Sequence, residues 1–156
     1  MLNRLVRDRI FAPADHVRIL MIKSCRNEEE LKRVIEYLNG ITANGVFGFT
    51  LYSFNTLLLQ LGKFGLVTLA QNVYTQLLSS GVKPSLLTLN TMINIFCKEG
   101  KVQEAMNRNL DKAFEVFDWM VKDGCDPNSV TYSTLINALC NEGSIGEAMN
   151  MLGRND

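Results

Sequence analysis

Residues that could support catalysis or hold a metal are few in this sequence, and they are poorly spaced for either task. His16 is the only histidine among 156 residues, and the four cysteines form no C-x-x-C pair. A zinc site needs close pairs of such ligands, and an activated serine or cysteine needs a base beside it. The sequence also lacks a glycine-rich phosphate loop. We therefore expect no enzymatic activity, no metal site and no cofactor.

The polar residues that do stand out are those that recur at fixed offsets. An Asn-Thr step occurs at Asn55 and again at Asn90, and a lysine occurs at Lys63 and again at Lys98, in both cases 35 residues later. The segment "CNEGSIGEAMN" (140–150) matches "CKEGKVQEAMN" (97–107) at seven of eleven positions. Self-similarity at this period is typical of repeat proteins.

Each copy predicts two helices and a closing corner. The first half is apolar at helical spacing, a glycine then ends the helix, and a second amphipathic helix leads to a Gly-x-x-Pro corner. The glycines are Gly65, Gly100 and Gly143, and the corners are 81–84 and 124–127. Two such helices cannot bury their apolar faces alone, whereas stacked copies can. The predicted fold is therefore all-α, an α-solenoid of helix-turn-helix repeats.

The repeat pattern divides the chain into five segments. We expect an N-terminal segment that forms a plain first helix, a degenerate helical repeat of two amphipathic helices, one regular repeat, one repeat with eight extra residues, and an incomplete repeat. Their ranges are 1–14, 15–50, 51–85, 86–128 and 129–156.

With the eight extra residues, "VQEAMNRN", the second half of unit 86–128 contains two successive segments that each resemble the start of a helix. The simplest account is a fusion of two repeats. Because apolar residues keep i+3/i+4 spacing across the junction, we predict one continuous helix from about residue 102 to 122, with residues 107–109 on its solvent side. At 1.5 Å per residue, this longer helix would carry Asn128 about 12 Å further along than in a regular repeat.

The phrases "VTYSTLINALCNEG", "TLNTMINIFCKEGKVQEA" and "FEVFDWMVKDGCDPN" resemble the pentatricopeptide repeat (PPR) family, of the pure 35-residue type common in plant organelles. The resemblance covers residues 51–152 clearly and 15–50 weakly. The tetratricopeptide repeat differs, because it places Trp and Tyr at fixed points that no copy here shows.

The resemblance implies binding of single-stranded RNA, about one base per repeat, read by two side chains. One reader would lie before the threonine of the first helix, and the other directly after the corner proline. The matching residues are Asn55, Asn90 and Ser133 for the first position, and Ser85 and Asn128 for the second. By the family's pattern, Asn55 with Ser85 favours cytosine, and Asn90 with Asn128 favours a pyrimidine.

The resemblance also implies a stacking position and a phosphate position. Residues that would lie between neighbouring bases are Tyr52, Leu87 and Val130. Lys63 and Lys98 match a lysine that contacts phosphate, and its charge would add a salt-dependent, sequence-independent share of affinity. Without the family, the asparagines would be interpreted as caps or solvated residues, Tyr52 as core, and the lysines as helix-end cations.

The rest of the sequence bounds the partners and the compartment. Sixteen Lys and Arg balance sixteen Asp and Glu, and no apolar run is long enough to span a membrane. Cysteines at the ends of apolar runs are expected to be buried, reduced thiols. The family resemblance implies organellar RNA metabolism, in the mitochondrion in preference to the plastid. The alternatives are a protein- or peptide-interaction solenoid, or a truncated, weakly functional PPR product. Separately, a solenoid without polar capping repeats is expected to self-associate through its uncapped ends.

Overall fold

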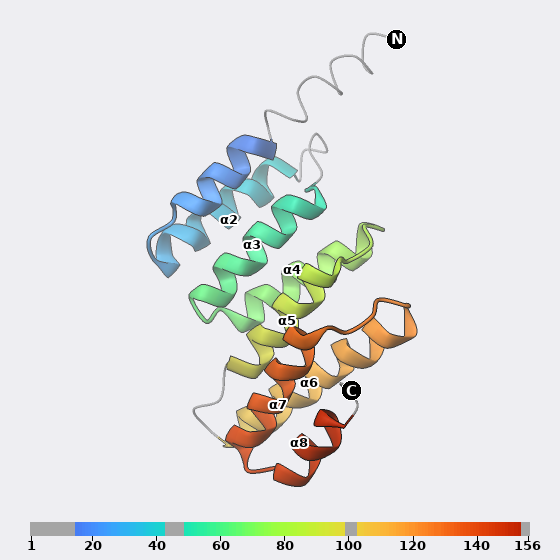
Figure 1. Ribbon diagram of the computed structural model, residues 1–156. Coiled ribbons are helices and arrows are strands. Elements are labelled where there is room, and N and C mark those ends of the chain that lie inside the picture. Colours follow the sequence, from blue (N-terminus) through green and yellow to red (C-terminus); the bar gives the residue numbers. More distant parts are fainter. Residues whose placement is uncertain (1–14, 43–48, 99–102, 154–156) are drawn as a thin grey trace.

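The protein is an array of paired α-helices, seen here in a computed structural model (Figure 1). The structure describes residues 15–42, 49–98 and 103–153, with the side chains of all of these except 41–42 and 103–108. Over these ranges the chain forms helices and connecting turns and no strand. The predicted all-α solenoid is confirmed, whereas the helix expected over 1–14 lies outside the described residues.

From α3 on, each helix packs against the next, and the pairs stack along the chain (Figure 1). In order, the helices are one over residues 15–24, α2 (Glu28–Thr42), α3 (Leu51–Lys63), α4 (Val67–Ser79), α5 (Leu86–Lys98), α6 (Gln103–Lys122), α7 (Ser129–Glu142) and α8 (Ile145–Leu152). Contacts join α3 to α4, α5 to α6 and α7 to α8 within pairs, and α3 to α5 and α5 to α7 between pairs. The first helices of successive pairs therefore lie side by side.

The hydrophobic core runs through the whole stack. Its largest fully buried aliphatic side chains are Ile22, Leu31, Leu58, Leu61, Leu77, Leu89, Met92, Ile93, Met120, Leu135 and Leu139. Burying each such side chain contributes roughly 1.5–3 kcal/mol, so the stability of each pair depends on its neighbours.

Glycines end the first helices of two pairs, as the sequence predicts. Gly65 and Gly143 have φ angles of 69° and 86°, which lie in a backbone region that residues with a Cβ rarely adopt. The N–H groups of the next residues, Leu66 and Ser144, each donate at 2.9 Å to a carbonyl five residues back, closing a Schellman motif. The third glycine, Gly100, lies outside the described residues.

The extra residues of the third pair lengthen its second helix. α6 is continuous over twenty residues, without a turn at 107–109, whereas α4 has thirteen. The predicted continuous helix is confirmed from Gln103 on. Both helices end two residues before their corner glycines, Gly81 and Gly124. The added length therefore lies at the N-terminal end of α6, away from the corner.

The cysteines differ in exposure more than expected. Cys25 is buried, Cys97 and Cys125 are half-buried, and Cys140 is exposed. The expectation of buried thiols is wrong for Cys140, which lies on the side of α7 that faces solvent. In the part of the chain that the structure describes, no cluster of His, Cys, Asp and Glu could hold a metal ion, and no helix is long and apolar enough to cross a membrane.

Candidate functional site

The first turns of α3, α5 and α7 share one polar arrangement. A polar residue precedes each helix, and its side chain accepts a hydrogen bond from the backbone N–H three residues later, at 3.1–3.3 Å. These pairs are Thr50 with Ser53, Ser85 with Thr88, and Asn128 with Thr131. This is the N-cap bond that satisfies a free N–H at a helix start.

Asn55 reaches across from α3 to the cap of α5. Its Nδ2 donates to Ser85 Oγ at 3.4 Å, and its Oδ1 accepts from Thr88 Oγ1 at 2.7 Å. The backbone N–H of Ser85 in turn donates to Thr88 Oγ1 at 3.0 Å. The side chain of Asn55 is nearly buried, with the residue 6% exposed. The structure thus brings together the first pair of residues that the family resemblance selected.

Asn90 makes the same contacts one unit later. Its Nδ2 donates to Asn128 Oδ1 at 3.2 Å, and its Oδ1 accepts from Thr131 Oγ1 at 2.6 Å. The backbone N–H of Asn128 donates to Thr131 Oγ1 at 3.1 Å. Two pairs of residues, far apart in sequence, therefore have matching geometry at successive interfaces.

The contact between Asn90 and Asn128 corrects one prediction. The eight extra residues were expected to carry Asn128 about 12 Å further along, at 1.5 Å per residue. That expectation is wrong, because the 3.2 Å contact matches that of the regular unit. The additional turns of α6 extend its other end, so the corner and the cap that follows it keep their place.

Ser133, the third residue matched to the first reading position, is exposed on α7. Its Oγ donates to the carbonyl of Val130 at 3.2 Å, within its own helix. The structure therefore places it at the same position of its helix as Asn55 and Asn90.

The second residue of each of these helices is apolar and exposed. Tyr52, Leu87 and Val130 are 59%, 51% and 55% exposed. Residues three apart on a helix are neighbours on its surface, so each lies next to a residue of the first reading position. The three positions that the resemblance assigned to base stacking are thus solvent-facing, and the interpretation of Tyr52 as core is excluded.

Basic side chains lie at the ends of the first helices and beside Tyr52. Lys63 and Lys98 are both exposed in the last turns of α3 and α5. The Nζ of Lys63 lies 5.5 Å from the Phe64 ring centroid. Sequence reasoning missed Lys23, whose Nζ donates to the Tyr52 hydroxyl at 3.4 Å and lies 5.7 Å from its ring centroid.

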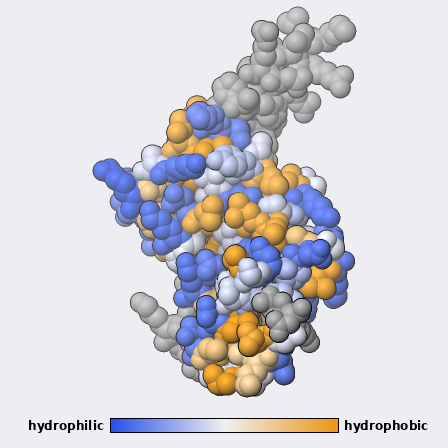
Figure 2. All heavy atoms as spheres, in the orientation of Figure 1, coloured by the Kyte–Doolittle hydropathy of each residue, from blue (hydrophilic) through white to orange (hydrophobic). Residues whose placement is uncertain are grey.

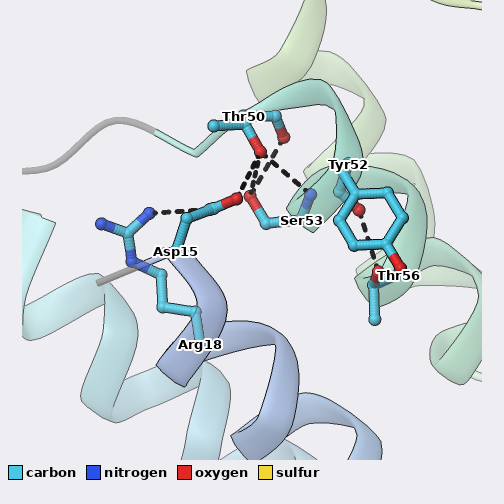
Figure 3. Close-up of polar contacts among 6 residues, drawn as sticks. All are labelled: Asp15, Arg18, Thr50, Tyr52, Ser53 and Thr56. Atoms are coloured by element: carbon cyan, nitrogen blue, oxygen red, sulfur yellow. Dashed lines mark hydrogen bonds and ion pairs between the residues drawn. The ribbon is translucent and has the colours of Figure 1, made fainter. Parts of the chain in front are cut away.

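A third polar contact, also missed by sequence reasoning, lies at the start of α3 (Figure 3). Thr50 Oγ1 donates to Asp15 Oδ2 at 2.7 Å, and Asp15 Oδ1 pairs with the buried Arg18 at 3.4 Å. Here a carboxylate, which can only accept, takes the place of the asparagine amide of the later units. A signal was present in the sequence, because Thr50-x-x-Ser53 lies 35 residues before Ser85-x-x-Thr88.

An ion pair links the first corner to the residue just before the second corner. Lys83 Nζ lies 2.8 Å from Asp123 Oδ2. The hydrogen bond and charge of Asp123 hold the pKa of the Lys83 ammonium above its usual value. Lys83 lies two residues before Ser85, and Asp123 lies five residues before Asn128. The ion pair therefore connects the two chain segments that lead to Ser85 and Asn128, the residues matched to the second reading position.

Three models of the pentatricopeptide repeat match the second half of the chain. The model described as PPR repeat family matches residues 105–141, and two models described as PPR repeat match 80–107 and 130–154. The first two ranges meet inside α6, where the eight extra residues were predicted to join two repeats.

Solved structures with the same fold include crystal structures of PPR10 in complex with an 18-nucleotide psaJ RNA element. The complex and its C256S/C430S/C449S variant each match with a TM-score of 0.61 at 19% identity over 90% of this chain. The match covers 22% of those chains, so this chain spans about a fifth of their length. At this identity, the likeness shows the shared fold.

Proposed function

Because this chain is a pentatricopeptide repeat protein, we propose that it binds single-stranded RNA along the first turns of α3, α5 and α7. The observation that carries the proposal is the repeated contact of Asn55 with Ser85 and of Asn90 with Asn128. Such paired amide and hydroxyl groups, buried or half-buried next to exposed apolar side chains, suit the edge and face of a nucleobase. RNA in the PPR10 complexes is consistent with this use of the fold.

Each unit would contact about one base. The pair Asn55 and Ser85 offers donors and acceptors to the edge of a cytosine, and the pair Asn90 and Asn128 offers amide groups to a pyrimidine. The exposed apolar residue before each pair would lie against the base faces, where stacking contributes about 1–3 kcal/mol per base. Tyr52, the only aromatic residue of the three, would make the largest contribution.

Lysines along the same units would contact the phosphates. Lys63 and Lys98 are separated by one unit, and Lys23 adds a cation beside Tyr52. These contacts would make binding depend on salt but not on sequence. We propose a binding function without catalysis, in organellar RNA metabolism and in the mitochondrion in preference to the plastid, as the pure 35-residue PPR type implies. The unit 86–128 would join parts of two such repeats.

The proposal is tested with the full chain and short RNAs at physiological salt. Binding of the hexanucleotide AACCAA is compared with that of AAAAAA by NMR titration of ¹⁵N-labelled protein. We expect the cytosine-containing RNA to bind more tightly and to shift the side-chain amide signals of Asn55 and Asn90. Asn55→Ala should reduce the preference for cytosine about fivefold, the worth of one hydrogen bond.

Asn72→Ala is the matched control, because Asn72 is an exposed asparagine on α4, outside the first turns. It should leave RNA binding unchanged. Equal, weak binding of both RNAs, together with tight binding of members of a peptide library, would instead favour a protein-interaction solenoid.

We also propose that α8 mediates weak self-association. Ile145, Met149 and Leu152 are 53%, 70% and 58% exposed and share one face of the helix. Hydrophobic residues gather at this end of the molecule (Figure 2). The earlier second helices, α4 and α6, contact the first helix of the following pair, and a second copy of the chain would supply that cover for α8. Met149→Glu should lower the concentration-dependent mass measured by light scattering.

A further inference from the structure

We propose that Thr88 and Thr131 are positioning residues that set which edge of the paired asparagine amide faces RNA. This inference rests on the proposed RNA binding and concerns how that site discriminates bases. Both threonines are almost fully buried, at 0% and 1% exposure, so neither can contact a base itself. Each nevertheless makes a short hydrogen bond to a reading residue of the preceding unit, at 2.7 Å and 2.6 Å.

The direction of these bonds follows from the backbone. The N–H groups of Ser85 and Asn128 donate to the threonine oxygens at 3.0 and 3.1 Å. A hydroxyl has one proton, and with its oxygen already accepting, that proton is available for the nearest acceptor. In both units the nearest acceptor is the Oδ1 of the asparagine, which is therefore turned inward.

At the second interface the orientation is determined from both sides. The backbone N–H of Thr131 donates to Asn128 Oδ1 at 3.1 Å, which fixes that atom as an oxygen. The atom of Asn90 that lies 3.2 Å from it must then be the donor, Nδ2. A flipped Asn90 would place two carbonyl oxygens against each other and leave the Asn128 carbonyl without this donor. Two backbone N–H groups thus determine the orientation of Asn90 through Asn128 and Thr131.

At the first interface, the orientation of the Asn55 amide is less tightly determined. Ser85 Oγ accepts from the backbone N–H of Thr88 at 3.3 Å, but its own proton can rotate toward Thr88 Oγ1, 3.0 Å away, or toward a ligand. The amide of Asn55 donates to this oxygen over a longer distance, 3.4 Å. The hydroxyl of Thr88 is therefore the main group that keeps the Oδ1 of Asn55 inward.

These hydrogen bonds therefore determine whether each pair offers donors or acceptors to a base. With both oxygens turned inward, Asn90 and Asn128 can offer only amide N–H groups to a base. Cytosine presents two adjacent acceptors on its pairing edge and suits such a pair, whereas the pairing edge of adenine presents only one. Without the threonine hydroxyl, Asn55 would lose its main orienting contact and Asn90 one of its two. Either amide could then turn more easily and offer its oxygen, and the preference for an acceptor edge would fall.

The test uses Thr→Val variants, which remove the hydroxyl with little change of shape, and Thr→Ser variants, which keep it. Full-length proteins are titrated with AACCAA and with RNAs in which either central cytosine is replaced by adenine. Asn90→Ala identifies the central position that belongs to the second pair. We expect Thr131→Val to lower the cytosine-over-adenine preference there by about fivefold and to keep it at the other position. Thr88→Val should do the reverse, and Thr131→Ser should behave as the original chain.

A purely structural role predicts a different pattern. Thr131→Val would then lower thermal stability and bind all RNAs more weakly by the same factor, with the preference intact at both positions, and that result would overturn the assignment. NMR relaxation of the Asn90 side-chain amide supplies a second measurement that needs no RNA. The amide should be rigid in the original chain and in Thr131→Ser and mobile in Thr131→Val. If no RNA binds, the proposed function fails, and equal rigidity in all three proteins would refute the positioning role.

Discussion

The substitution Gly62→Ala tests how closely the first helices of successive units must approach. Gly62 lies in the last turn of α3, and a Cβ built on it would lie 2.8 Å from Cγ1 and 3.3 Å from Cδ1 of Ile95 on α5. Carbon atoms in favourable contact are about 3.5–4.0 Å apart. Ile95 is 2% exposed, and Cγ1 is bonded directly to its Cβ, so the side chain has little room to move away.

Two effects of this substitution oppose each other. Alanine is favoured over glycine inside a helix by about 0.5–1 kcal/mol, and less near a helix end. Overpacking a well-packed contact costs about 1–3 kcal/mol. Since Gly62 is next to the last residue of α3, the clash should dominate, and we expect the free energy of unfolding to fall by about 1–2 kcal/mol. At this chain length, that lowers the melting temperature by roughly 3–6 °C.

Circular-dichroism melts of four variants (Gly62→Ala, Gly40→Ala, Ile95→Ala and the Gly62→Ala/Ile95→Ala double variant) measure the balance. Gly40→Ala is the control, because Gly40 lies near the end of α2 and a Cβ there would meet nothing within 4 Å; this change should be neutral or stabilising. In an Ile95→Ala background, which removes the contact, Gly62→Ala should no longer destabilise. A higher melting temperature for Gly62→Ala in the original chain would refute the reasoning.

Three other predictions concern polar and titrating groups. Asp15→Asn should lower the free energy of unfolding by about 1–2 kcal/mol in urea melts, because the buried Arg18 guanidinium loses its ion pair; the effect should vanish in an Arg18→Met background, and an unchanged midpoint would contradict it. Burial raises the pKa of Tyr74 from 10.0 to about 12. The folded state therefore retains a phenol proton that the unfolded chain releases, so this stabilisation is complete below pH 10 and is lost as the pH rises towards 12. The free energy of unfolding relative to that of Tyr74→Phe should therefore decline across that range in melts at each pH, and a constant difference would exclude the assignment. Burial also raises the pKa of Cys97 to about 12, whereas Cys140 is exposed, so iodoacetamide at pH 8 should modify Cys140 on the order of 100-fold faster by mass spectrometry; equal rates would show that Cys97 is accessible.

The sequence predicted the helices and their order, because the signals for both are local. Apolar residues at i+3 and i+4 spacing identify the buried faces, and Gly65 and Gly143 mark where the first helices end. The pairing of Asn55 with Ser85 needed more than spacing. It came from the register of a known repeat, and physical reasoning on one sequence would have left Asn55 as a cap or solvated residue.

The first polar contact of the stack was not predicted, because the segment before it lacks the pattern that marks the other corners. Ser85 and Asn128 follow a Gly-x-x-Pro corner, whereas Thr50 follows "NGVFGF". Its partner, Asp15, also lies nine residues before the end of its helix, where Asn55 and Asn90 lie eight. The pattern polar-x-x-Ser/Thr at a helix start identifies Thr50 from the sequence, whereas only the packing of the helices identifies Asp15 as its partner.

The incorrect prediction for Asn128 shows which contacts determine where the paired residues lie. The prediction measured displacement from the start of α6 and assumed that this start was fixed. The contacts of α5 with α7, together with the bonds that join Asn90, Asn128 and Thr131, fix the other end instead. A unit built in this way can gain or lose turns where its second helix begins without moving the pair that follows. The same change between Gly124 and Asn128 would shift the cap itself, so the corner is the part whose length the proposed site depends on.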